Sequence, residues 1–178
     1  MPQRPHLLAV VLLLLAGPAQ ATVLADWTLE ERIAHSDSVV AGTITAQRVT
    51  RVGDDIVTES TVVVSRTLFG PERRELTVSQ LGGTIGETTL HVEGSAHFEV
   101  GDEVVLIVKR DARGRDQLVG MSLGAFLVKG RLARQSIRVP LMGSDGRLRK
   151  APGEQVVDME RIRAAAADVR RTLDRTVR

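Results

Sequence analysis

The chain has 178 residues, a length that suits one domain or one domain with short appendages. Apolar residues make up 43% and charged residues 26%, close to globular averages, so collagen-like and disordered chains are excluded. The absence of Cys excludes disulfides, thiolate zinc sites, iron–sulfur clusters and a cysteine nucleophile. With no Tyr, one Trp and three Phe, the chain also lacks the aromatic platforms on which single-stranded nucleic acids stack, so no nucleic-acid partner is expected.

The start of the chain has the pattern of a secretory signal peptide, predicted over residues 1–21. Arg4 precedes an uninterrupted apolar run, residues 7–16, and small residues at Ala19 and Ala21 form a cleavage site. A membrane-spanning helix needs about 20 apolar residues, so this run is too short to be an anchor. Residues 1–21 contain no Arg-Arg pair, which favours export by the general secretory route, to the periplasm or the exterior. Cleavage is expected after Ala21, and a second acceptable site follows four residues later.

A short helix is predicted near the start of the mature chain. Thr28 and Glu31 have the spacing of a capping box, in which each side chain bonds the other residue's backbone N–H. Leu29 and Ile33 then share one helical face, which favours a helix over residues 29–35.

Residues 22–140 are predicted to form an antiparallel, mainly β domain. Side chains alternate between apolar and polar in most segments, and Gly-rich turns separate them. Residues 104–108 are apolar on both faces, which is typical of a central strand covered on each side. Seven or eight strands at this spacing favour a small barrel or a sandwich. The expected strands are 38–49, 56–69, 76–79, 88–92, 104–108, 118–121, 125–128 and 137–139.

The last part of the chain changes character. Residues 141–157 are rich in Gly, Pro and basic side chains and are predicted to be a linker. Residues 158–178 are predicted to form an amphipathic helix with Asp158 as its cap. Its apolar positions are spaced alternately three and four apart: Met159, Ile162, Ala166, Val169, Leu173 and Val177. Such a stripe can pack on the barrel, lie on a membrane surface or form a dimer.

Charge is divided unequally along the mature chain. Residues 22–128 carry ten basic and sixteen acidic side chains, a net charge of −6, whereas residues 129–178 carry thirteen and six, a net charge of +7. This asymmetry favours docking of the basic tail on the acidic body, and an anionic envelope surface is the alternative partner.

Residues 120–124 match G-x-S-x-G, the nucleophile elbow of serine hydrolases. The elbow requires a strand, a sharp turn and a helix, which together expose the serine hydroxyl. Here another strand is expected after Ser122, and the chain has no β–α–β alternation. We therefore interpret Gly120-Met121-Ser122-Leu123-Gly124 as a glycine-lined bend between two strands and assign no catalytic residue.

Histidine and acidic side chains gather between residues 91 and 99. His91 and Glu93 lie two apart on one face of an expected strand, and His97 and Glu99 could add further metal ligands. The spacing matches no zinc signature, and His91 falls on a polar face. We interpret these side chains as exposed surface residues, and no metal or cofactor is assigned.

Two other groups of residues are interpreted as structural. The acidic pairs Asp54-Asp55 and Asp102-Glu103 fall at expected turns, where Asp is common. Residues 82–86 are glycine-rich, but they lack the Lys and the following helix of a phosphate-binding loop. We expect them to form a corner in a bent sheet.

The order of these features resembles that of exported bacterial proteins with an OB-type barrel, akin to the netrin-like (tissue-inhibitor-of-metalloproteinase-like) module. The resemblance implies a fold rather than an activity. Inhibitors of that type chelate a protease zinc through an N-terminal Cys, and this Cys-free chain cannot use that mechanism. OB-type barrels bind through one sheet face and its loops. The resemblance is carried by residues 36–44 (SDSVVAGTI), 61–70 (TVVVSRTLFG), 82–83, 98–106 (FEVGDEVVL), 119–120 and Gly124.

The sequence therefore predicts an exported, non-enzymatic binding or accessory protein that acts through a protein partner. Two alternatives remain open: an envelope-surface protein that uses its basic C-terminal helix, and a serine hydrolase centred on Ser122. A binding module requires an exposed apolar patch or groove on the barrel. An enzyme requires Ser122, or His91 with acidic partners, in a pocket with convergent polar groups.

Overall fold

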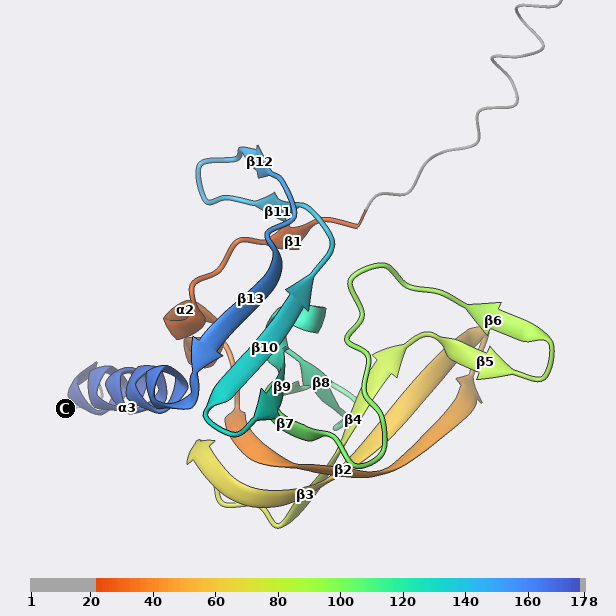
Figure 1. Ribbon diagram of the computed structural model, residues 1–178, viewed down its shortest axis with the longest axis horizontal. Coiled ribbons are helices and arrows are strands. Elements are labelled where there is room, and N and C mark those ends of the chain that lie inside the picture. Colours follow the sequence, from red (N-terminus) through yellow and green to blue (C-terminus); the bar gives the residue numbers. More distant parts are fainter. Residues whose placement is uncertain (1–21, 177–178) are drawn as a thin grey trace, which may run out of the picture.

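The computed structural model describes residues 22–176 and shows a mainly β protein with a C-terminal helix (Figure 1). The predicted signal peptide lies outside these residues. The helices are α2 (Leu29–Ala34), the 3₁₀ turn η1 (Met121–Gly124) and α3 (Met159–Thr176). The strands are β1 (Leu24–Ala25), β2 (Ser38–Val52), β3 (Asp55–Phe69), β4 (Glu75–Leu81), β5 (Gly83–Ile85), β6 (Thr88–Leu90), β7 (Glu103–Arg110), β8 (Asp116–Leu118), β9 (Ala125–Lys129), β10 (Leu132–Ile137), β11 (Leu141–Met142), β12 (Leu148–Arg149) and β13 (Gly153–Asp158).

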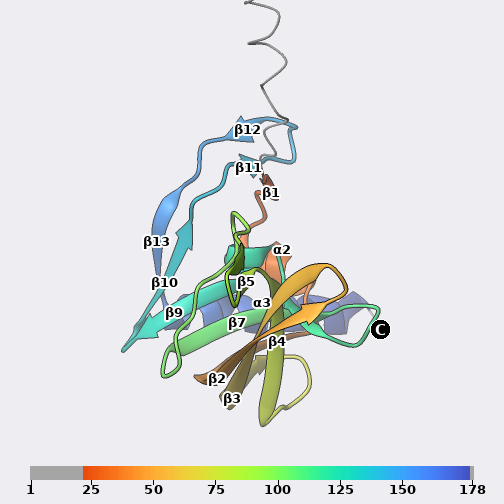
Figure 2. The same ribbon diagram turned by 90° about the vertical axis from the view of Figure 1, so that its right-hand side faces the viewer.

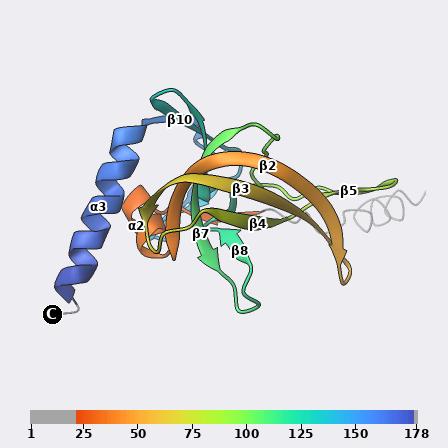
Figure 3. The same ribbon diagram turned by 90° about the horizontal axis from the view of Figure 1, so that it is seen from below.

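Eight of the strands form the main sheet, in the order β13-β10-β9-β7-β2-β3-β4-β8. β2 and β3 make a long antiparallel hairpin that arches over the molecule (Figure 3). Register shifts between Ala41 and Gly42 and at two further points bend this hairpin, because each adds an unpaired residue. At Gly42 a Cβ atom would lie 2.3 Å from the carbonyl oxygen of Val63, so only glycine allows the two strands this approach.

The last strand of the main sheet returns to its middle. β4 pairs in parallel with β8 through Val78 and Asp116, and β8 also pairs antiparallel with β7. Two small sheets complete the fold. β5 and β6 form one of them, and β1, β11 and β12 form the other, at the end where the described chain begins (Figure 2).

Strand β7 is buried on both faces and separates two hydrophobic cores. Val104, Leu106 and Val108 point into an inner core with side chains from β2, β3 and β4. Val105 and Ile107 point into an outer core, which α2 and α3 cover. The two-sided apolar pattern of this strand is therefore confirmed.

The sequence also predicted both helices. Glu31 accepts from the backbone N–H of Thr28 while the Thr28 hydroxyl accepts from Glu31 N, which confirms the capping box of α2. In α3 the Asp158 carboxylate accepts from Glu160 N, as a cap does.

Most of the apolar stripe of α3 packs on the sheet, so docking is the alternative that the structure adopts. The buried members are Met159, Ile162, Ala166 and Val169, and Ala165, which the predicted stripe did not include, is buried with them. Leu173 is 45% exposed, and the last turns project beyond the body (Figure 3). Val177 lies outside the described residues. An ion pair of 2.5 Å between Arg161 and Glu30 joins α3 to α2, in agreement with attraction between the basic tail and the acidic body.

The structure differs from the expected strands in four respects. It has more of them than the seven or eight predicted. The strand expected over 118–121 is instead β8, which ends at Leu118, because the chain then turns at Gly120 (φ 67°) into η1. Residues 141–157, where a linker is expected, contain β11, β12 and most of β13, because backbone pairing compensates for the Gly and Pro residues there: β13 pairs with β10, whereas β11 pairs with β12 and β1. The strand expected over 137–139 instead runs from 132 to 137, because Gly130 in a left-handed turn (φ 61°) folds β9 directly back into β10. No helix within residues 22–176 is both long and apolar enough to cross a bilayer.

Candidate binding site around the strap between β6 and β7

The connection between β6 and β7, which we call the strap (residues 91–102), crosses the sheet and is fastened on both sides. Ser122 N donates to the carbonyl oxygen of Gly94 at 2.9 Å. On the other side the Ser95 hydroxyl donates to Leu81 O at 3.2 Å, and Ala96 N donates to the Gln80 side chain at 3.1 Å. Pockets open on both sides of this segment.

The first side faces β3, β4 and β8, and we call its two adjoining cavities the mouth. Their volumes are ≈ 310 Å³ and ≈ 250 Å³, and Gln80, Leu81 and Ser95 line both of them. Leu81 stands at their shared rim with 49% of its surface exposed. The walls of the mouth also hold apolar and polar residues: Val57, Leu90, Val92, Arg115, Gln117 and Met121.

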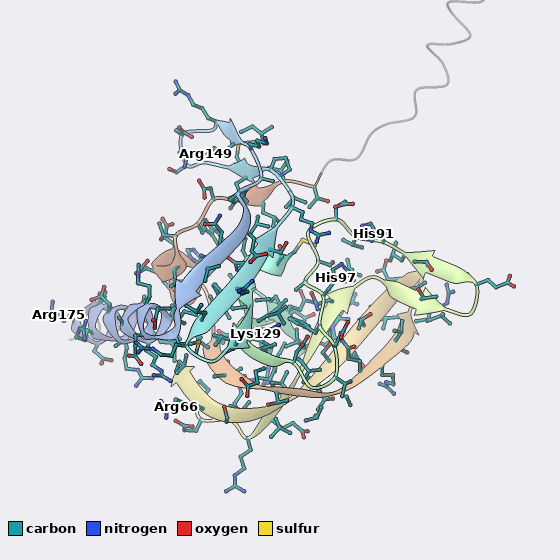
Figure 4. The ribbon with its side chains drawn as sticks, viewed as in Figure 1. Arg66, His91, His97, Lys129, Arg149 and Arg175 are labelled. Carbon is teal, nitrogen blue, oxygen red and sulfur yellow. The ribbon has the colours of Figure 1, made fainter. Side chains whose placement is uncertain are left out.

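The second side faces η1, β9 and β10, and we call its cavity, of ≈ 300 Å³, the cationic pocket. Arg134, Ser136 and Arg138 line one wall, and His91 and His97 line the strap wall. Figure 4 shows both histidines on the strap, close to β10. Sequence analysis singled out the histidines but not the arginines, because residues so far apart in the chain meet only through the fold.

The predicted motif around Ser122 folds as a left-handed turn followed by η1. Gly120 and Met121 both have positive φ, 67° and 56°, and such values are uncommon for a non-glycine residue. Ser122 lines the cationic pocket, yet its hydroxyl is buried and has no hydrogen-bond partner within residues 22–176. The arrangement therefore does not pair this hydroxyl with a histidine base in the described part of the chain.

A buried polar network, which sequence analysis missed, holds η1 in place. The Gln135 side chain is buried and donates to the carbonyl oxygens of Ser122, Leu123 and Ala125 at 3.0, 2.7 and 3.3 Å. Arg32 of α2 donates to Gln135 Oε1 at 3.2 Å and to Leu123 O. Removal from water lowers the pKa of Arg32 to about 10. The only sequence signal was a polar residue at an inward position of the alternating strand β10.

A second buried polar cluster supports β8. Asp116 is buried and accepts from Arg73 at 2.5 Å and from Arg110 at 3.2 Å. These hydrogen bonds raise the pKa of Arg110 above its usual value. Both guanidiniums are engaged with one carboxylate, so we assign this cluster a structural role.

The remaining candidates lie at the surface or beside turns, and Asp55 and Glu103, expected at turns, begin strands β3 and β7. His91 and Glu93 are exposed and bond to each other at 3.0 Å. No group of three or more metal-ligating His, Asp or Glu side chains occurs within residues 22–176. Gly53 and Asp54 form a turn, and Asp102 accepts from Glu99 N in another.

Within the glycine-rich segment 82–86, where a corner is expected, Gly82 joins β4 to β5, residues 83–85 form β5 and Gly86 lies in a turn. Gly82 and Gly83 have φ of 111° and 134°, and the segment leads from β4 directly into β5 rather than into a helix. It therefore lacks the helix N-terminus on which a phosphate loop depends.

No protein-family model matches the sequence, and a comparison with curated proteins finds no match. The OB-type and netrin-like resemblance thus remains a prediction from the residues quoted above. The fold and the site define a mainly β protein with a docked C-terminal helix and a strap flanked by pockets.

Proposed function

We propose that this chain is an exported, non-enzymatic binding protein that engages a protein partner through the mouth of an OB-type barrel. The barrel part of the proposal is supported by the strand pairings, which run from β7 through β2, β3, β4 and β8 and back to β7. A five-stranded antiparallel arrangement with one parallel pair, curved by bulges, is consistent with a small barrel of this type.

The observation that carries the binding proposal is the composition of the mouth. Its cavities combine apolar walls with amide and hydroxyl groups, and Leu81 is half exposed at the rim. Val49 and Val52, at the tip of the β2–β3 hairpin, are also more than a third exposed. Exposed apolar side chains beside a concave, partly polar surface are typical of binding sites.

A non-enzymatic role is favoured because the two buried groups that could take part in catalysis, a carboxylate and a hydroxyl, are either in ion pairs or without a nearby base. Asp116 is neutralised by two arginines, and the Ser122 hydroxyl has no base within hydrogen-bond reach among the described residues. Nucleophilic catalysis needs such a base, and it needs an accessible hydroxyl.

Capture of a partner by the mature chain, from periplasm or culture supernatant, tests the proposal. We expect Leu81→Asp to abolish capture, because a charge at the rim cannot be buried against an apolar partner. Leu148→Asp is the matched control, since Leu148 is 60% exposed on β12, away from the strap pockets. The same partner captured equally well by the Leu81→Asp variant would refute the assignment of the mouth.

The envelope-surface alternative is favoured by one observation, the projecting end of α3. Arg170, Arg171 and Arg175 are exposed there beside Leu173, a combination that suits an anionic lipid surface. Co-sedimentation of the mature chain with anionic vesicles, compared with neutral ones, tests it. If this alternative is correct, the variant in which all three arginines are changed to Gln must lose its binding to anionic vesicles.

A further inference from the structure

We infer that the cationic pocket binds a carboxylate carried on an apolar group. This pocket lies across the strap from the larger cavity of the mouth, and it shares six strap residues with the smaller one: His91, Val92, Ser95, Ala96, His97 and Phe98. The arginine wall lines the cationic pocket and neither mouth cavity, so the inference does not rest on the proposed protein partner. Three features support the inference: the arginine wall, the apolar side chains of the lining and the bond between Glu93, an acidic residue of the lining, and His91.

The arginine wall follows from the alternation of β10. Ala133, Gln135 and Ile137 are buried on one face of the strand, so the intervening residues face the other way. Those residues and the one that follows the strand, Arg134, Ser136 and Arg138, all line the pocket. One strand therefore presents two guanidiniums with a hydroxyl between them, and guanidinium donors match the geometry of a carboxylate.

The two arginines differ in whether they form an ion pair within the described residues. Arg134 donates to Glu154 of β13 at 3.1 Å, and both side chains are about half exposed. Arg138 forms no ion pair with any residue between 22 and 176. An arginine without a counter-ion beside a cavity is available to an incoming anion, and Arg134 becomes available when Glu154 releases it.

The interior of the pocket is apolar. Phe98, Ala125 and Leu127 line it, and the Phe98 and Ala125 side chains also belong to the inner core or its edge. The volume of ≈ 300 Å³ lies at the lower end of the range for small-ligand sites. Its size and lining suit a short apolar group joined to the anion that the arginines bind.

The carboxylate in the lining of the pocket, Glu93, is held by a neighbouring histidine and leaves the two arginines to the ligand. Among the described residues of its lining, Glu93 is the one carboxylate, and it is bonded to His91 at 3.0 Å. His97 adds an imidazole donor on the same wall. The lining thus carries a net positive charge although residues 22–128 are acidic overall.

Benzoate and benzamide are the probes, since they share a ring and differ in charge. Titration of the mature protein, followed by the backbone amide signals of Gly94 and Ser136, should show saturable shifts with benzoate and at least about ten-fold weaker binding of benzamide. Arg138→Gln should weaken benzoate binding about ten-fold or more. Arg113→Gln, the same change of residue in the exposed β7–β8 loop, leaves the arginine wall intact and should bind benzoate as the wild type does.

Glu154→Gln provides a change in the opposite direction. It releases Arg134 and should strengthen benzoate binding several-fold, whereas Glu72→Gln, an equal change of charge in the β3–β4 loop, should leave it unchanged. Thermal melting confirms that each variant is folded. If Arg138→Gln does not fold, the benzoate affinities of Glu154→Gln and Glu72→Gln still test the inference, and equal affinities would contradict it.

Three results would overturn the inference: no shift with benzoate, equal binding of benzamide, or wild-type affinity in a folded Arg138→Gln variant. The source of the carboxylate is separated by a second pair of probes, the peptide acetyl-Ala-Ala-Val-Phe with a free C-terminal carboxylate and the same peptide as an amide. Tighter binding of the free peptide than of benzoate assigns the pocket to chain termini. The reverse order assigns it to small free acids.

Discussion

Replacement of Gln135 by Leu removes the amide at the centre of the network that holds η1. Leu has nearly the same size as Gln and keeps the buried face of β10 apolar. The change in stability therefore reports the loss of the hydrogen bonds of the amide. The amide donates to three backbone carbonyls, at 3.0, 2.7 and 3.3 Å, and accepts from Arg32 at 3.2 Å.

The expected loss follows from these contacts. Leu123 O keeps its bond from Arg32 and Ser122 O keeps one from Ala125 N, but the carbonyl of Ala125 loses the amide donor and Arg32 loses the Oε1 acceptor. Each buried group left without a partner costs about 1–3 kcal/mol, so we expect a loss of about 3 kcal/mol in the free energy of unfolding. For a domain of this size, that corresponds to a fall in Tm of about 6–12 °C.

Equilibrium urea unfolding of the mature chain measures this loss. Gln155→Leu is the matched control: Gln155 faces Gln135 across the β10–β13 ladder, but it is exposed and its amide reaches only nearby carbonyls. We expect a change below about 0.5 kcal/mol there. Equal stabilities of the two variants would refute the assignment of Gln135 as the support of η1.

Three further predictions concern the fold. Gly124→Ala should destabilise the protein by about 3 kcal/mol in urea unfolding, because its Cβ would lie 2.6 Å from Val119 O and 2.9 Å from Ile107 O, and neither is a side-chain atom that can move aside. Ile162→Ala should cost about 2–5 kcal/mol and Leu173→Ala less than about 1 kcal/mol, because Ile162 is fully buried and Leu173 is 45% exposed; equal costs would contradict the docking of α3. The hydrogen bond from Thr28 N lowers the pKa of the Glu31 carboxyl, so its stabilising effect is complete above the ordinary Glu pKa and is lost as the pH falls through the lowered value. NMR titration of that carboxyl should show the lowered midpoint, and Glu31→Gln should make acid unfolding less steep.

Sequence predicted the elements whose information is local. The capping box of α2 needs only Thr28 and Glu31, and the two-sided burial of β7 follows from five consecutive apolar residues. In α3 the spacing identified the buried face correctly up to Val169. Leu173 continues the same stripe but lies beyond the edge of the sheet, and periodicity cannot show where the surface under a helix ends.

Features that depend on distant segments were missed. β13 is held by pairing with β10, and its Gly and neighbouring Pro obscure any strand pattern. Arg73, Arg110 and Asp116 come from three separate parts of the chain, so their meeting leaves no motif. The same reason hid the arginine wall of the cationic pocket, because its two histidines and two arginines meet only after β10 lies beside the strap.

The position of α3 has a consequence for the order of events during biogenesis. The outer core combines Leu29 and Ile33 from the beginning of the described chain with Ile162 and Val169 from its end. Until α3 has been synthesised, the side chains of Leu29 and Ile33 are not covered by it, and the outer core remains exposed to water. Contacts this distant in sequence form slowly. A nascent polypeptide of this design thus completes its outer core only after its last segment is available.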